Sequence, residues 1–129
     1  MNSFTAGIIV IGDEILSGRT KDSNSSFIAQ KLIKEGIKLE EVIVIKDDKK
    51  TIIDNIINYS EKYSYVFTTG GIGPTHDDIT SESISEAFNL DYVINKEAFK
   101  ILDNYYPKGE FNESRQRMAK MPDGSELIL

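Results

Sequence analysis

The sequence of 129 residues contains no cysteine, and His76 is its only histidine. The absence of cysteine excludes disulfide bonds, thiolate metal sites and cysteine nucleophiles. A single histidine cannot form the clusters that bind zinc, so we interpret His76 first as an ordinary loop residue. A role as one metal ligand, or as a hydrogen-bonding partner of a phosphate, is the alternative.

Positive charge and long apolar runs are also scarce. The 15 basic residues are outnumbered by 21 acidic ones, which gives a net charge of −6. The basic residues are scattered, whereas a nucleic-acid surface needs a clustered basic face. The first apolar run, residues 6–11, has no basic residue before it and soon gives way to Asp13 and Glu14, which is unlike a signal peptide or a membrane span. We expect a cytoplasmic protein that contacts neither nucleic acid nor membrane.

The chain has the length of about one domain, enough for a hydrophobic core but not for a second catalytic domain. Its 40% hydrophobic and 28% charged residues are ordinary for a soluble globular protein. The composition therefore leaves the fold class to be decided by the pattern along the chain.

Continuous apolar runs rich in β-branched residues predict buried strands at residues 6–11, 42–45 and 65–69. Helical spacing of apolar residues follows each run, at residues 28–33, 52–57 and 84–88. This repeated alternation predicts a doubly wound α/β fold, with a parallel sheet and helices on both sides. Because the first strand is the most uniformly apolar, we expect it inside the sheet, between the other two.

The remaining elements are predicted from local signals. After residue 91 we expect a short strand at residues 92–94, then two helices and a final strand over Glu126–Leu129. Residues suited to begin helices are Asp22 or Asn24, Thr80, Asn95 and Asn112, and residues suited to end them are Gly36 and Asn89.

A glycine-rich loop follows the third predicted strand, with glycines at 70, 71 and 73. Glycine allows positive φ and lets backbone N–H groups face a ligand, which suits a phosphate. The positive end of the helix starting near Thr80 would point back toward this loop. The loop matches neither the P-loop nor the G-x-G-x-x-G motif, and a turn without a ligand is the alternative. We favour a ligand site, because ligands bind at the carboxyl ends of strands in open α/β sheets.

Pairs of acidic residues follow all three predicted strands: Asp13 with Glu14, Asp47 with Asp48, and Asp77 with Asp78. In a parallel sheet these pairs lie at one edge, where they could hold Mg²⁺ or act as a general base. About half of them could instead be helix caps or surface groups. Carboxylates beside a phosphate loop would repel a bare phosphate, so a divalent cation is expected between them. The candidates to neutralise a diphosphate are Arg19, Arg115 and Arg117, each of which could also be a solvated surface residue.

The motifs together resemble a known family. They are residues 11–19 (Ile-Gly-Asp-Glu-Ile-Leu-Ser-Gly-Arg), 22–24 (Asp-Ser-Asn), 70–80 (Gly-Gly-Ile-Gly-Pro-Thr-His-Asp-Asp-Ile-Thr) and 115–119 (Arg-Gln-Arg-Met-Ala) with Pro122. The chain is similar over nearly its whole length to the molybdopterin-binding (molybdenum cofactor biosynthesis) domain of competence/damage-inducible protein A and to the N-terminal domain of eukaryotic FAD synthase.

This resemblance implies a three-layer α/β/α fold with a mostly parallel sheet, a ligand site at the strand carboxyl ends, and dimers or trimers. It also implies either recognition of a phosphorylated pterin or metal-dependent hydrolysis of a nucleoside diphosphate-linked compound such as ADP-ribose or FAD. The deamidase domain of longer members is absent, so we do not expect nicotinamide-nucleotide deamidation. Members continue after residues 126–129 with a glycine-proline-rich segment, so we expect a domain over residues 1–129 that lacks this part or completes its pocket with another subunit.

Two function hypotheses result: a metal-dependent nucleotide pyrophosphatase, or a non-catalytic molybdopterin-binding or scaffold domain. For the first, Asp47 and Asp78 are expected to be catalytic and to hold Mg²⁺ or Co²⁺. The expected ligand-binding residues lie in the loops after the first and third strands and at the starts of the following helices: Gly12, Asp13, Glu14, Ser17, Gly18, Asn24, Gly70, Gly71, Ile72, Gly73, Pro74, Thr75 and Thr80.

The apolar residues Phe111, Met118 and Leu127–Leu129 lack an obvious covering layer in the predicted fold. Uncovered apolar patches commonly mark interfaces. We therefore expect a homo-oligomer, a dimer or trimer, in which Arg115 or Arg117 of one subunit could approach the carboxylate loop of another.

Overall fold

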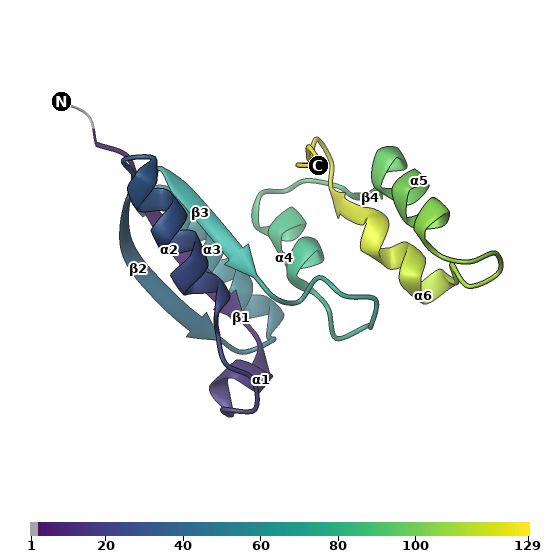
Figure 1. The fold of residues 1–129 in the computed structure, drawn as a ribbon, viewed down its shortest axis with the longest axis horizontal. Coiled ribbons are helices and arrows are strands. Elements are labelled where there is room, and N and C mark those ends of the chain that lie inside the picture. Colours follow the sequence, from purple (N-terminus) through teal and green to yellow (C-terminus); the bar gives the residue numbers. More distant parts are fainter. Residues whose placement is uncertain (1–2) are drawn as a thin grey trace.

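The computed structural model of the chain describes residues 3–129 (Figure 1). Strands and helices alternate as far as α4, which confirms the predicted α/β class. In chain order the elements are β1 (Thr5–Ile11), α1 (Asp13–Leu16), α2 (Asn24–Lys34), β2 (Lys38–Ile45), α3 (Lys49–Lys62), β3 (Tyr65–Thr69), α4 (Thr80–Ala87), β4 (Tyr92–Ile94), α5 (Lys96–Tyr105), α6 (Glu113–Gln116), the 3-10 helix η1 (Arg117–Ala119) and β5 (Lys120–Pro122).

The main sheet has the strand order β2-β1-β3, and both pairings are parallel. This confirms that the first strand lies inside the sheet, where Ile8 pairs with Val42 on one side and Phe67 on the other. Residues 6–11 are all buried, as expected for a strand that is covered on both faces. The predicted burial of the other two strands was wrong, because β2 and β3 are edge strands: only Ile45 of residues 42–45 is buried, and none of residues 65–69 is. All three strands end at the same edge of the sheet, so the loops that follow them are neighbours.

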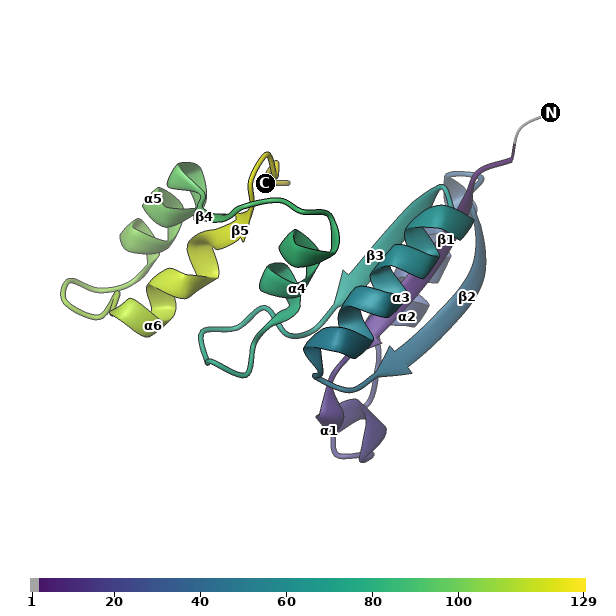
Figure 2. The same cartoon turned by 180° about the vertical axis from the view of Figure 1, so that it is seen from behind.

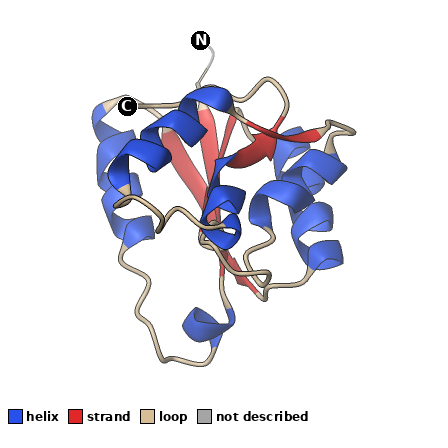
Figure 3. Cartoon of the chain, turned by 90° about the vertical axis from the view of Figure 1, so that its right-hand side faces the viewer, coloured by secondary structure: helices blue, strands red, loops and turns tan. Residues whose placement is uncertain are grey.

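Helix α2 covers one face of the sheet and α3 the other (Figure 1 and Figure 2). The side view also shows helices on both sides of the strands (Figure 3). Each fully buried isoleucine contributes about 1.5–3 kcal/mol through removal of apolar surface from water. The core between the sheet and α3 consists of Ile9, Ile11, Ile45, Ile52, Ile56 and Tyr59.

The second part of the molecule is built around α4, which packs against α3 on one side and against β4 and β5 on the other (Figure 2). Strands β4 and β5 form an antiparallel ribbon in which Val93 pairs with Met121. The ribbon places α6 and η1 close to the loop that precedes α4. None of the helices within residues 3–129 combines the length and apolar content needed to cross a bilayer.

The predicted final strand over Glu126–Leu129 was wrong. The strand that pairs with β4 is Lys120–Pro122, directly after η1, and the following turn is closed by a hydrogen bond from the Ser125 N–H to the Pro122 carbonyl. The apolar residues after the turn form no strand, and Ile128 is fully exposed. The turn at Pro122 therefore ends the ribbon instead of introducing another strand.

Most predicted helix ends are confirmed by local hydrogen bonds. The side chains of Asn95 and Asn112 accept from the N–H groups of Ala98 and Arg115, and Gly36 and Asn89 take positive φ just after their helices. Asp22, at the start of α2, accepts from the Ser25 N–H at 3.3 Å, whereas Asn24 is the first helical residue. Local sequence signals therefore suffice to predict the start of a helix when the capping side chain and its N–H partner are three residues apart.

Thr80 is not an N-cap. Ile79 occupies that position in α4 and provides no side-chain bond, whereas Thr80 is the first helical residue. The buried Thr80 hydroxyl donates instead to the Gly70 carbonyl at 2.9 Å, and so ties the helix back to the glycine loop.

We predict that Gly7→Ala destabilises the fold by about 1–3 kcal/mol, the usual cost of overpacking a core. A Cβ at Gly7 would lie 2.7 Å from the Cδ2 atoms of both Tyr59 and Tyr63. These rings pack edge to face, and Tyr59 is buried, so neither can move aside freely. Urea denaturation measures the change in the free energy of unfolding.

Tyr59→Phe is the matched control. The Tyr59 hydroxyl is buried and has no partner within hydrogen-bonding geometry among residues 3–129, and the nearby Glu41 interacts with it only weakly, so its removal should change stability little. A Gly7→Ala variant as stable as the Tyr59→Phe variant would contradict this packing.

Candidate functional site

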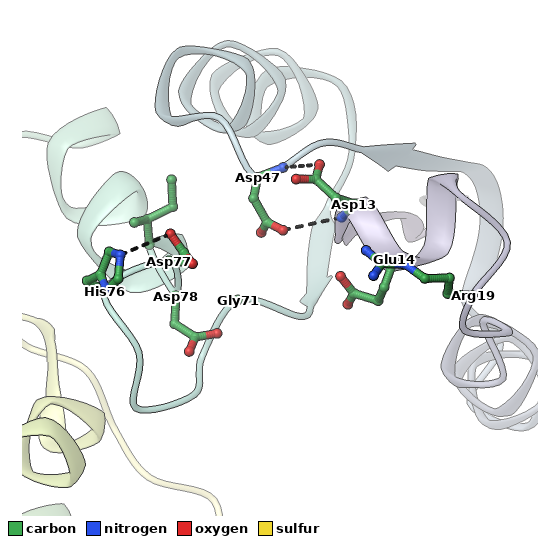
Figure 4. A pocket seen from close by; sticks show the side chains of 9 residues that line it. Asp13, Glu14, Arg19, Asp47, Gly71, His76, Asp77 and Asp78 are labelled. Carbon is green, nitrogen blue, oxygen red and sulfur yellow. Dashed lines mark hydrogen bonds and ion pairs between the residues drawn. The ribbon is translucent and has the colours of Figure 1, made fainter.

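A cavity of about 470 Å³ lies at the edge where the three strands end (Figure 4). We call it the carboxylate pocket. Its lining confirms the predicted convergence of the loops after β1, β2 and β3, with one exception: Asp48 is outside and caps α3 by accepting from the Thr51 N–H. The pocket is lined by Asp13, Glu14, Arg19, Asp47, Gly71, His76, Asp77, Asp78 and Ile79.

Asp13 and Asp47 hold the first two loops together through reciprocal hydrogen bonds. The Asp13 N–H donates to Asp47 Oδ2 at 3.3 Å, and the Asp47 N–H donates to Asp13 Oδ1 at 3.2 Å (Figure 4). The Gly12 N–H adds a third contact, to the Ile45 carbonyl at 3.0 Å. Each carboxylate thereby has a fixed orientation at the pocket wall.

The surroundings of Asp47 destabilise the charged form of its carboxylate. Burial raises the pKa of Asp47, and the negative charges of Asp13, Glu14 and Asp78 raise it further, while the hydrogen bond from the Asp13 N–H opposes the rise. The charged form of Asp47 is therefore held in an environment that disfavours it. Any cation in the pocket would remove much of this penalty.

Asp78 has a second function inside its own loop. Its Oδ2 accepts from the Thr75 N–H at 2.9 Å and from the Thr75 hydroxyl at 2.8 Å, and Figure 4 shows the side chain turned toward the bend of the loop. Burial by itself would raise the pKa of Asp78, but these bonds, a bond from the Gly73 backbone and the charge of Arg117 together hold it below its ordinary value. Asp78 is thus a stabilised carboxylate, in contrast to Asp47.

The glycines of the loop are required by close backbone approaches. A Cβ at Gly70 would lie 2.0 Å from the Ile11 carbonyl oxygen, and one at Gly71 would lie 2.1 Å from Thr80 Oγ1. Both residues also have positive φ, 91° and 69°. The loop therefore passes close to the end of β1 and the start of α4, and these contacts alone require glycine.

An ion-pair network fixes α4 relative to the loop that carries Asp47. Lys49, at the start of α3, contacts Glu82 at 3.3 Å and Glu86 at 2.8 Å on α4. These side chains are partly exposed, so each pair contributes only about 0–1 kcal/mol. Its main effect is to align the loops after β2 and β3.

The predicted ligand-binding residues do not all share one cavity. Asp13, Glu14 and Gly71 line the carboxylate pocket, whereas Asn24 and Gly70 line a cavity of about 240 Å³ near the start of α2. Ile72 and Gly73 line a third cavity, together with Met118 and Met121. Pro74 and Thr75 line a fourth cavity, together with Asn112 and Ser114. The remaining predicted residues line none of these four cavities: Gly12, Ser17, Gly18 and Thr80.

The sequence did not point to Tyr92 or Lys120, which lie beside the glycine loop. They lie beside the glycine loop because the β4–β5 ribbon packs against α4, and no local sequence pattern predicts that packing. The pocket residue His76 is largely exposed and lies 3.5 Å from the Asp77 carboxylate. Within residues 3–129, no group of three or more histidine, aspartate or glutamate side chains could hold a metal on its own.

The two pocket aspartates should affect stability with opposite signs. A raised pKa means that the charged form of Asp47 destabilises the fold once the pH exceeds that pKa. We predict that Asp47→Asn, which keeps an oxygen acceptor for the Asp13 N–H, raises the free energy of unfolding at pH 7 by up to about 1 kcal/mol. The gain should shrink as the pH falls toward about 4, where both folded and unfolded chains become protonated.

Asp78→Asn should do the reverse. Because the pKa of Asp78 is lowered, its charge stabilises the fold above the unfolded-state pKa, and this contribution is lost as the pH falls through the folded pKa. At pH 7 the loss should be about 1.5 kcal/mol, the low end of the range for hydrogen bonds to a charged group. Urea unfolding at pH 7 and pH 4 tests both variants, and an Asp47→Asn variant less stable than wild type at pH 7 would refute the first.

Comparison with known proteins adds the family context. The profile of a family described as "Probable molybdopterin binding domain" matches residues 7–125. The crystal structure of the protein CinA, of unknown function, from Thermoplasma acidophilum superposes with a TM-score of 0.87 at 32% identity, over 95% of this chain and 73% of that chain. Fold and sequence thus agree along nearly the whole chain.

Curated relatives are longer. A protein of Archaeoglobus fulgidus is 39% identical over 94% of this chain, which spans 52% of that protein. A "Probable FAD synthase" of Caenorhabditis elegans is 41% identical over 80% of this chain, which spans 20% of that protein. The chain therefore corresponds to about half or less of the length of these relatives.

Proposed function

This chain belongs to the molybdopterin-binding domain family, and from that premise we propose that its carboxylate pocket binds the phosphate groups of a small ligand together with a divalent cation. The proposal depends mainly on one observation: carboxylates from three loops face one cavity beside a glycine loop. A bare phosphate would be repelled there. A cation between phosphate and carboxylates is attracted to both.

The residues fit such a cation. Carboxylate oxygens are the ligands that Mg²⁺ prefers, and Mg²⁺ in phosphate sites commonly takes only one or two protein carboxylates and completes its shell with phosphate oxygens and water. The absence of a self-sufficient metal group within residues 3–129 is compatible with this mode. Asp47 and Asp78 are the proposed ligands, and the cation would neutralise phosphate charge and favour attack by water on phosphorus.

The chain's own groups have separable roles in this proposal. Asp47, held in place by the Asp13 N–H, would assist Asp78 in binding the cation or accept a proton from the attacking water. The N–H groups of Gly71 and Ile72 donate to no other described residue, so they can bind phosphate oxygens. Together these groups support metal-dependent hydrolysis of a nucleoside diphosphate-linked compound of the ADP-ribose or FAD type.

A second candidate is a non-catalytic molybdopterin-binding or scaffold domain. It is favoured by the absence, among residues 3–129, of a group of side chains that could hold a metal without the ligand. In that case the pocket would bind a phosphorylated pterin without turnover.

Incubation with ADP-ribose or FAD in Mg²⁺ or Co²⁺, followed by measurement of AMP, tests the enzymatic function. We expect AMP formation to fall by about 10²-fold or more in Asp47→Asn, the usual loss for a general base. Asp78→Asn should also be impaired. The matched control is Asp48→Asn, which changes the adjacent carboxylate, retains an N-cap on α3 and should keep wild-type activity.

Equal AMP formation by wild type and Asp78→Asn, or none by wild type, would reject hydrolysis. Calorimetric titration then decides about the second candidate. Binding of molybdopterin without nucleotide turnover would support it, and binding of neither ligand would exclude both.

We also propose that the chain forms a homo-oligomer. Part of the apolar surface expected to be uncovered is in fact packed, because Phe111 lies against Phe99 and Tyr106. Other apolar side chains around the β4–β5 ribbon and α5 remain exposed, and such residues are commonly buried between subunits. They are Phe88, Leu90, Val93, Ile94, Ile101 and Tyr105.

Light scattering at micromolar concentration should therefore report the mass of a dimer or trimer, and dilution should weaken ligand binding if the pocket depends on assembly. A monomeric mass with ligand affinity unchanged on dilution would rule out this assembly.

A further inference from the structure

The glycine loop has a second face, opposite in charge to the carboxylate pocket. A hollow of about 190 Å³ on that face shares Gly71 and Asp78 with the carboxylate pocket. Its other wall includes Arg117 and Lys120, which η1 and β5 provide. One side of the loop therefore faces mainly carboxylates, with Arg19 at the pocket wall, and the other side faces Arg117 and Lys120, with Asp78 shared by both.

Arg117 is the cation of this hollow that is not engaged elsewhere. Its side chain is half-buried and forms no ion pair within 4 Å among residues 3–129. Lys120, in contrast, has its Nζ 4.8 Å from the centre of the Tyr92 ring. Arg117 therefore retains its hydrogen-bonding capacity for a ligand.

Arg115, two residues earlier, provides an internal comparison. Its guanidinium stacks on Tyr106 at 4.5 Å and donates to the Glu110 carbonyl at 2.7 Å. Through these contacts Arg115 stabilises the turn before α6, so its role is structural. Among residues 3–129, Arg117 has no such stacking partner and no such hydrogen bond.

The backbone beside Arg117 is fixed. Ala119, at the end of η1, is fully buried, and its carbonyl accepts from the Asn95 N–H at 2.8 Å. This bond attaches η1 to the junction of β4 and α5, and the β4–β5 ribbon in turn packs on α4. Arg117 is thereby held beside the glycine loop of its own chain, and no partner subunit is needed to supply this charge.

We propose that Arg117 determines ligand specificity by binding a second phosphate, across the glycine loop from the phosphate in the carboxylate pocket. This inference rests on the proposed phosphate-binding function. A guanidinium suits the task because its planar N–H groups match two oxygens of one phosphate. A diphosphate gains this contact, whereas a monophosphate in the carboxylate pocket does not reach it.

The alternative role for Arg117 is that of a counter-charge for Asp78, whose pKa it helps to lower. Loss of a counter-charge would weaken the binding of monophosphates and diphosphates alike. Loss of a phosphate contact would weaken only the diphosphates. The ratio of the two affinities separates these roles.

Calorimetric titration of the full chain with ADP and with AMP in MgCl₂ tests the inference. We expect wild type to bind ADP at least about tenfold more tightly than AMP, as a charge-assisted contact implies. Arg117→Gln should lose this preference with little change for AMP, and Arg117→Lys should retain part of it. Arg115→Gln should keep the wild-type ratio, and thermal unfolding should show that each variant is folded.

An unchanged ratio of ADP to AMP affinity in Arg117→Gln would overturn the role of Arg117 while leaving phosphate binding intact. An equal loss of both affinities would also overturn it, in favour of the counter-charge role. Wild-type protein that binds neither nucleotide would overturn the proposed function itself and this inference with it.

Discussion

The site depends on the position of β1 inside the sheet. This strand is paired on both edges and covered on both faces, so its carboxyl end lies between the ends of β2 and β3. The reciprocal hydrogen bonds between Asp13 and Asp47 are possible only because β1 and β2 are parallel and end together. The same position brings Gly70 within contact of the Ile11 carbonyl. A change in strand order would separate all three loops.

This arrangement concentrates negative charge at some cost to stability. Burial is the main cause that raises the pKa of Asp47, and the charges of three nearby carboxylates raise it further, so its charged form is disfavoured. Functional sites commonly retain groups that a more stable protein would not have. The Asp78 carboxylate in the same pocket instead accepts hydrogen bonds from the N–H and the hydroxyl of Thr75, and these bonds help to shape the loop. The pKa of Asp47 is thus raised and that of Asp78 lowered, because the hydrogen-bond donors around the two aspartates differ.

The glycine loop joins two parts of the molecule. On one side it contacts the end of β1, and on the other its carbonyls accept the hydroxyl and the N–H of Thr80. Helix α4 then carries the β4–β5 ribbon, which places Arg117 next to the loop. Opposite charges on the two faces of one loop are well suited to a ligand that needs both a cation and a guanidinium.

The sequence by itself determined the three parallel strands, the central place of the first, the convergence of acidic residues at one edge, and the Asn95 and Asn112 caps. These features follow from apolar periodicity and from contacts a few residues apart, which a local pattern records. Only the tertiary structure decided that Asp47 and not Asp48 faces the pocket, that Lys120–Pro122 and not Glu126–Leu129 forms the last strand, and that Arg117 approaches Asp78. Each of these depends on packing between segments far apart in the chain, where several pairings satisfy the local pattern equally well and burial selects one.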